Sequence, residues 1–141
     1  MKHERIFKMK KIIRFAAVLF VFITVLSVVA CNERDVWKDA TYTENTELGE
    51  GKTQVTVVVE AQGKSVTLTV NTDKDNLGEA LFELGLINDP SFFDTVNGMR
   101  LDWNEDKAYW GFYKNGEYMT VGADEAPLAG VEQYELVYTK G

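Results

Sequence analysis

Two stretches in the middle of the chain alternate apolar and polar residues as the strands of a β-hairpin do. Residues 53–61 carry valine at positions 55, 57 and 59, and residues 65–71 alternate valine or leucine with polar residues. A two-residue turn at Gln62-Gly63 places Val59 opposite Val66, so that every apolar pair falls on one face. The other pairs are Val57 with Leu68 and Val55 with Val70. This pattern predicts a half-buried hairpin.

A short helix is predicted directly after this hairpin. Its apolar positions recur at i, i+3, i+4 and i+7, namely Leu77, Ala80, Leu81 and Leu84. Asn76 followed by Glu79 resembles a capping box, and Gly85 suits the left-handed position that ends a helix. We expect the apolar stripe to pack on the valine and leucine face of the hairpin.

A second hairpin is predicted at residues 108–121, AYWGFYKNGEYMTV. Asn115-Gly116 is a strong signal for a tight turn, because both residues accept the positive φ angles that a type I′ turn requires. The register puts Phe112 opposite Met119 and Trp110 opposite Val121, and we assign these four side chains to the core. A final strand is expected at Gln133–Thr139.

The other face of the second hairpin is the candidate binding site. It pairs Tyr113 with Tyr118, and Gly111 and Tyr109 follow along the same strand. Rigid tyrosine rings around a glycine floor are suited to holding a flat or amphipathic ligand. The alternative is a tyrosine ladder that stabilises the sheet by cross-strand pairing.

Residues 86–107, between the helix and the second hairpin, have a weaker pattern. Met99–Trp103 is a candidate strand, and Asp102–Asp106 resembles the opening of a calcium-binding loop. Lys107 stands where that loop needs glycine, and Tyr113 where it needs a bidentate glutamate. We therefore favour an ordinary Asx-rich turn and assign no metal site.

The N-terminus has the form of an export signal. A basic segment precedes the uncharged run Phe15–Ala30, and Cys31 follows it as the only cysteine in the chain. Val28–Cys31 resembles the lipobox of bacterial lipoproteins, in which the cysteine is lipidated before cleavage. The alternative is an uncleaved anchor, although 16 apolar residues fall short of the ~20 that span a bilayer. We predict a signal peptide at 1–30, an acylated flexible tether at 31–51, and a domain at 52–141 on the extracytoplasmic face of the cell membrane.

Composition narrows the chemistry of that domain. The precursor carries 15 basic and 22 acidic residues, and residues 31–141 hold nine of the basic and 21 of the acidic ones. A protein surface with this excess of acidic residues repels nucleic acid. The only histidine, His3, lies in the signal, and Cys31 would be consumed by the lipid. Nucleophile–histidine catalysis and disulfides are excluded, and we expect a non-enzymatic protein.

The second hairpin and the strand after it carry a family resemblance. Tyr109–Tyr118, Gly122-Ala123-Asp124 and Tyr134–Tyr138 resemble the transcobalamin-like C-terminal domain family, and the resemblance covers about Thr53–Thr139. It implies a small α+β domain with a mixed or antiparallel sheet and one packed helix, a β-grasp-like arrangement. In the vertebrate carriers of this family the domain closes over cobalamin together with a helical barrel, and no segment of this sequence resembles that barrel.

Two functions remain as hypotheses. The first is a membrane-anchored lipoprotein that captures a corrinoid-like or other small ligand for uptake, through Tyr109, Gly111, Tyr113 and Tyr118. The second is a protein-interaction or adhesion module on the cell surface, with no small-molecule site.

Overall fold

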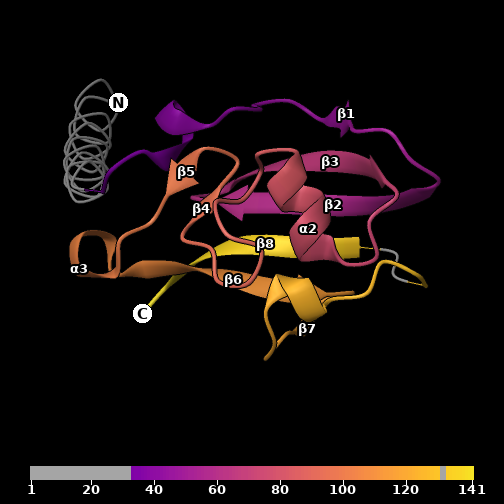
Figure 1. Cartoon of the computed structure of the whole chain (residues 1–141). Coiled ribbons are helices and arrows are strands. Elements are labelled where there is room, and N and C mark those ends of the chain that lie inside the picture. The colour runs from indigo at the N-terminus through magenta and orange to yellow at the C-terminus, as the bar shows by residue number, and fades with distance from the viewer. Residues whose placement is uncertain (1–32, 131–132) are drawn as a thin grey trace, which may run out of the picture. The chain divides into compact units, whose positions relative to one another are not determined.

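A six-stranded mixed β-sheet forms the centre of the domain (Figure 1). The computed structural model describes residues 33–130 and 133–141, of which Asp35–Gly141 form one compact unit. The strand order is β1-β3-β2-β8-β6-β7. In chain order the elements are η1 (Val36–Asp39), β1 (Thr46–Leu48), β2 (Thr53–Ala61), β3 (Lys64–Thr72), α2 (Leu77–Glu83), β4 (Thr95–Val96), β5 (Met99–Arg100), α3 (Trp103–Asp106), β6 (Ala108–Lys114), β7 (Glu117–Tyr118), η2 (Ala123–Glu125) and β8 (Gln133–Lys140).

The first hairpin has the predicted register. β2 and β3 are antiparallel, with Val59 opposite Val66, and the turn residues Gln62 and Gly63 have φ angles of 50° and 78°. These valines and leucines are buried, and they form the centre of the sheet face that packs on the core. The alternation of apolar residues and the position of the turn together specify this pairing.

The predicted helix is α2, and it covers one face of the sheet (Figure 1). Its N-cap is Asn76, whose side-chain oxygen accepts a hydrogen bond from the Glu79 amide at 2.9 Å. Leu77, Ala80 and Leu81 are fully buried, and Gly85 follows the helix with a φ of 69°. The domain is therefore an α+β protein, as predicted. We call the side of the sheet under α2 the helix face, and the opposite side, which carries Thr56 and Thr67, the polar face.

The last strand joins the two hairpins into one sheet. β8 runs parallel to β2 and antiparallel to β6, between them. Tyr134 and Leu136 of β8 are buried on the helix face, where Leu136 lies opposite Phe112. The central position of β8 makes β6 part of the same core.

The N-terminal segment differs from the expected tether from Asp35 onward. Val36 and Trp37 in η1 are 1% and 8% exposed, and the Trp37 indole nitrogen donates to the Ala61 carbonyl at 2.7 Å. Further on, β1 pairs in parallel with β3. Two buried side chains, an indole hydrogen bond and an added edge strand hold this segment on the domain, although its composition is that of a linker.

A buried asparagine fastens the same segment on its other side. Asn97 is 1% exposed, and its side-chain oxygen accepts from the Tyr42 amide while its side-chain nitrogen donates to the Tyr42 carbonyl, at 2.9 and 2.8 Å. The Thr41 amide also donates to the Asn97 carbonyl. Residues 35–48 are thus an integral part of the domain.

The candidate strand Met99–Trp103 is shorter than expected, because β5 ends at Arg100 and Trp103 begins α3.

The predicted signal peptide and the lipidation residue Cys31 lie outside the described residues. Within the described part of the chain, no helix is both long and apolar enough to cross a membrane.

Candidate functional site

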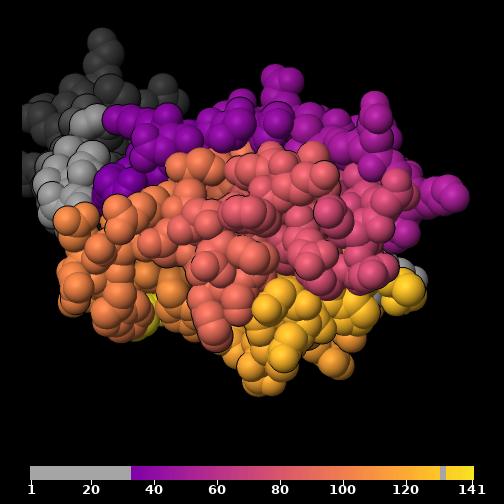
Figure 2. Space-filling view, viewed as in Figure 1, coloured from indigo at the N-terminus to yellow at the C-terminus, as the bar shows by residue number. Residues whose placement is uncertain are grey.

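A hollow of about 230 Å³ opens on the helix face of the sheet beside β6. Its floor is formed by Trp110 and Phe112, which are almost fully buried. One wall is the loop Ser91–Phe93 and the other is the segment Tyr118–Ala123. Figure 2 shows the face on which the loop after α2 and the segment after β7 come together. The hollow is therefore built from the second hairpin, with the chain that follows it, and from a loop about 20 residues earlier in the sequence.

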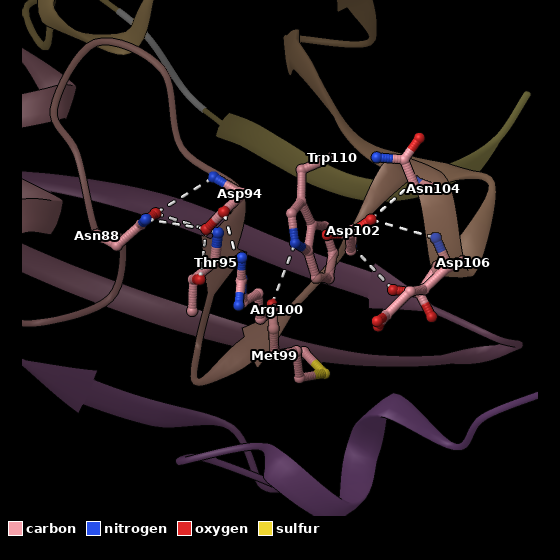
Figure 3. Close-up of polar contacts among 10 residues, drawn as sticks. Asn88, Asp94, Thr95, Met99, Arg100, Asp102, Asn104, Asp106 and Trp110 are labelled. Atoms are coloured by element: carbon pink, nitrogen blue, oxygen red, sulfur yellow. Dashed lines mark hydrogen bonds and ion pairs between the residues drawn. The ribbon is translucent and has the colours of Figure 1, made fainter.

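The floor is held rigidly by aromatic contacts and one hydrogen bond. The Trp110 indole nitrogen donates to the Met99 carbonyl at 3.2 Å (Figure 3), and the ring meets Tyr138 edge-on. Phe112 stacks on Tyr134 with ring centroids 5.3 Å apart. A ligand in the hollow would meet a preformed aromatic surface.

The loop wall is fixed by a carboxylate. Asp89 Oδ1 accepts hydrogen bonds from the amides of Ser91 and Phe92 at 2.7 and 3.0 Å. The two amide bonds, that of Phe92 first, lower the pKa of Asp89 below its ordinary value. Phe93 turns inward and meets Phe112 edge-on, whereas Phe92 is 84% exposed at the rim.

The other wall forms where the second hairpin ends. The Asn115-Gly116 turn and the Tyr113–Tyr118 pair occur as predicted, and the Met119 amide still donates to the Phe112 carbonyl. Beyond Met119 the strand pairing stops, and Val121 is exposed at the hollow. The predicted core pair of Trp110 and Val121 is therefore wrong, because the chain leaves β6 and opens the space that the pair would have filled.

Gly122 shows how closely the two walls approach each other. A Cβ at this position would lie 2.8 Å from the Ser91 carbonyl oxygen and 2.7 Å from a carboxylate oxygen of Asp124. Because only glycine leaves room for this approach, Gly122 helps to keep the hollow narrow. The sequence reasoning did not find this site, although Phe92, Phe93 and the aromatic strand β6 were visible in the sequence.

Of the four predicted site residues, only Tyr118 lines the hollow. Tyr109, Gly111 and Tyr113 alternate with the core residues Trp110 and Phe112 and so lie on the polar face. Tyr109 is half-exposed and lies 6.3 Å from Trp103, measured between ring centroids.

The expected gap above Gly111 is filled in the structure. A Cβ at this position would lie 2.8 Å from the Thr139 hydroxyl oxygen and 3.1 Å from Cε2 of Tyr113, and the Tyr113 ring also meets Tyr118 edge-on. The ring thus covers the glycine, a known way of protecting a glycine within a sheet. This contact favours the structural interpretation of the tyrosines, because the Tyr113 ring occupies space above Gly111 where a flat ligand was expected to lie.

The acidic segment at Asp102 is a helix cap (Figure 3). Asp102 Oδ1 accepts from the amides of Asn104 and Glu105, and Asp106 Oδ2 accepts from the Asp102 amide at 2.8 Å. These carboxylates bind backbone amides, as in the Asx-rich turn that the sequence favoured. Among the residues that the structure describes, no three histidine, cysteine or acidic side chains are grouped to hold a metal ion.

A neighbouring polar network orders the chain between α2 and β5. Asp94 accepts from the Asn88 side chain at 2.9 Å and from the Thr95 hydroxyl at 2.7 Å, and Arg100 forms an ion pair with it at 3.4 Å (Figure 3). The Asn88 side-chain oxygen in turn accepts from the amides of Asp94 and Thr95. This network supports the loop that carries Ser91–Phe93.

Comparison with known proteins gives one informative likeness. No protein-family model and no curated protein matches the chain. A solved structure from Ruminococcus gnavus, of a protein for which metal binding has been suggested, is similar with a TM-score of 0.57 and 27% sequence identity. The match covers 64% of this chain and 99% of that one. The likeness supports the fold of the domain.

Proposed function

We propose that this protein is a cell-surface lipoprotein whose domain binds a ligand without catalysis, and that the hollow beside β6 is the binding site. The export-type N-terminus and Cys31 support the anchoring on the extracytoplasmic face. The domain topology, with a hairpin, a packed helix and a central parallel strand pair, supports a β-grasp-like description and the resemblance to transcobalamin-like domains.

One observation carries the assignment of the site. Six large apolar or aromatic side chains are exposed in the described part of the chain, and three of them, Phe92, Tyr118 and Val121, belong to residues that line the same hollow. Tyr118 lines it from the edge strand β7, because its ring meets that of Tyr113. Exposed apolar groups gathered over a preformed aromatic floor are typical of binding surfaces. The remaining three are Phe82, Trp103 and Tyr109.

The size of the hollow limits the ligand. Pockets that enclose a drug-sized molecule measure roughly 300–1,000 Å³, and this hollow measures about 230 Å³. It suits one ring or one edge of a larger flat molecule. A corrinoid-like ligand would be gripped at its edge between Phe92 and the Trp110 floor and would need a second protein surface to be enclosed.

The second candidate function is protein interaction on the cell surface. A hollow of this size also suits a single aromatic side chain of a partner, inserted as an anchor between Phe92 and Val121. Binding would then depend on a peptide side chain and not on a corrin or porphyrin ring.

The test is a titration of residues 31–141, carrying Cys31→Ser to keep the protein soluble, against cobalamin, haem and aromatic-rich peptides. Phe92→Ala should weaken binding of the probe at least tenfold, because truncation of a central aromatic anchor commonly costs more than about 1.4 kcal/mol. Phe82→Ala is the matched control, because Phe82 is also exposed but does not line the hollow. Equal weakening by both variants, or binding unaffected by Phe92→Ala, would refute the site.

Anchoring is tested separately. A labelled fatty acid should be incorporated into the full-length protein and not into its Cys31→Ser variant. Equal labelling of both proteins would refute the lipoprotein assignment without bearing on the hollow.

A further inference from the structure

One end of the domain gathers the start of the folded chain, the β2–β3 turn, α3 and the C-terminus. Trp37 and Val36 bond to Ala61 and Gln62 at the end of β2, and Gly141 bonds to the Lys107 carbonyl beside α3. β8 runs parallel to β2, and its last residues pair with the first residues of β6. Figure 1 shows α3, the C-terminus and the indigo segment that contains η1 at the same end of the strands. We call residues 35–39, 62–64, 102–107 and 140–141 the proximal end.

We propose that the proximal end lies directly against the lipid bilayer, with Trp103 and its neighbour Tyr109 in contact with the head-group region. This inference rests on the proposed lipidation of Cys31. It goes beyond that proposal by assigning a membrane-contact surface and an orientation to the domain.

Chain length is the first argument. Only three residues separate Cys31 from Asp35, and Val36 is already buried in the fold. Four residue steps span at most about 14 Å of fully extended chain. The polar layer on each side of a bilayer is roughly 5–8 Å thick. A domain held this closely to a lipidated residue has to meet the head groups with the surface around its chain entry.

Exposed aromatic rings are the second argument. Trp103 is 52% exposed and Tyr109 is 41% exposed, and their ring centroids lie 6.3 Å apart. The backbone of Gly141 lies against the Trp103 ring, which places the ring beside the C-terminus at the proximal end. Tryptophan and tyrosine are enriched where proteins meet the membrane interface, because each combines an apolar ring with a polar tip.

Charge distribution is the third argument. Residues 35–141 contain eight basic and 20 acidic residues, and the proximal end holds four of the basic but only five of the acidic ones. The basic ones are Lys38, Lys64, Lys107 and Lys140. The strongly acidic remainder of the domain is repelled by anionic lipid, whereas the proximal end is close to neutral. The orientation that places this end on the bilayer is therefore electrostatically favoured.

The orientation has a consequence for the candidate site. β6 runs from the proximal end toward the Asn115-Gly116 turn, and the hollow involves Phe112 and Tyr118 near that turn. Contact of the proximal end with the bilayer would leave the hollow accessible from the outside medium.

The experiment uses the acylated protein, purified from membranes and reconstituted into phosphatidylcholine vesicles that carry bromine on acyl carbons near the head groups. Bromine quenches tryptophan fluorescence on contact. Trp37 and Trp110 are buried, so we expect quenching of Trp103 that disappears in Trp103→Phe. A flexible Gly/Ser insertion of about 20 residues between Arg34 and Asp35 should remove most of the quenching, because such a linker has an r.m.s. reach of roughly 25 Å.

A charge variant tests the orientation without touching the aromatic contact. Lys64→Glu combined with Lys107→Glu should reduce quenching in vesicles that contain anionic lipid and leave it unchanged in phosphatidylcholine alone. Denaturant titration of each variant confirms that the fold is intact.

The outcomes separate this inference from the proposed function. Absence of the fatty-acid label would refute the lipoprotein assignment itself. A labelled protein whose Trp103 is not quenched, or is quenched equally with the long insertion, would refute the membrane-contact surface while leaving lipidation and the hollow intact. Quenching that persists in Trp103→Phe would show that the signal comes from another tryptophan and would also overturn the inference.

Discussion

The indole nitrogen of Trp37 donates a 2.7 Å hydrogen bond to the carbonyl of Ala61, and both residues are buried. This bond ties the first folded residues of the chain to the end of the central strand β2. It explains why a segment with the composition of a linker belongs to the domain, and it makes the N-terminal boundary of the fold testable.

We predict that the domain needs residues 35–51 for its stability. Trp37→Ala should lower the free energy of unfolding by about 3–5 kcal/mol, as truncation of a buried aromatic side chain does. A chain that begins at Lys52 loses Trp37, Val36 and β1, and it should unfold at clearly lower denaturant concentration than one that begins at Asp35. Denaturant titration followed by circular dichroism measures both effects. Equal stability of the two chains would show that the N-terminal segment only rests on the domain.

The core side of α2 provides the second prediction. Leu81 is fully buried, so Leu81→Ala should cost about 2–5 kcal/mol of unfolding free energy. Phe82 is the next residue and is 52% exposed, so Phe82→Ala should cost less than about 0.5 kcal/mol. A loss of similar size in both variants would mean that the helix is rotated from the position described here.

The two hairpins and the helix were predictable because short-range patterns determine them. With the turn fixed at Gln62-Gly63, the alternating valines pair in a single register, and that register puts all apolar pairs on one face. Asn76 and Gly85 mark the ends of α2 through local backbone chemistry. In each case the residues that specify the element are neighbours in the sequence.

The features that were missed depend on contacts between distant segments. Nothing near Trp37 in the sequence indicates Ala61, and nothing near Tyr42 indicates Asn97, more than 50 residues away. The hollow was missed for a related reason. Its existence depends on the chain leaving β6 after Met119, whereas the hairpin pattern by itself continues the pairing to Val121.

The contact between Gly111 and its neighbours gives the third prediction. Gly111→Ala would place a methyl group against Thr139 and Tyr113 and should cost about 1–3 kcal/mol, as over-packing does. Thr139→Ala should recover part of this loss, because the closest predicted contact is with the Thr139 hydroxyl. A double-mutant cycle by denaturant titration measures the recovery, and strictly additive losses would show that the clash lies elsewhere.

Tyr113→Ala separates a structural from a binding role for the tyrosines on the polar face. Because the Tyr113 ring covers Gly111 and meets Tyr118 edge-on, its removal should lower the unfolding free energy by about 1 kcal/mol. Binding at the hollow on the other face should be unchanged in a ligand titration. A large loss of binding without loss of stability would show that the binding site lies on the polar face.

The last prediction concerns the pH dependence of the loop beside the hollow. The amides of Phe92 and Ser91 lower the pKa of Asp89 below its ordinary value of 3.8, so the ionised carboxylate is favoured in the folded protein. A lowered folded-state pKa means that the stabilisation is complete above the ordinary pKa and is lost as the pH falls through the folded-state pKa. The amides of Ser91 and Phe92 should therefore shift in a nitrogen–proton NMR titration below about pH 4. In the Asp89→Asn variant, which lacks the titrating carboxyl group, the signals of these two amides should show no such transition. The Thr67 amide is the internal control, because it donates at 2.9 Å to the uncharged side chain of Asn45. If Ser91 and Phe92 show no transition below pH 4 that depends on Asp89, then the carboxylate does not hold this wall of the hollow.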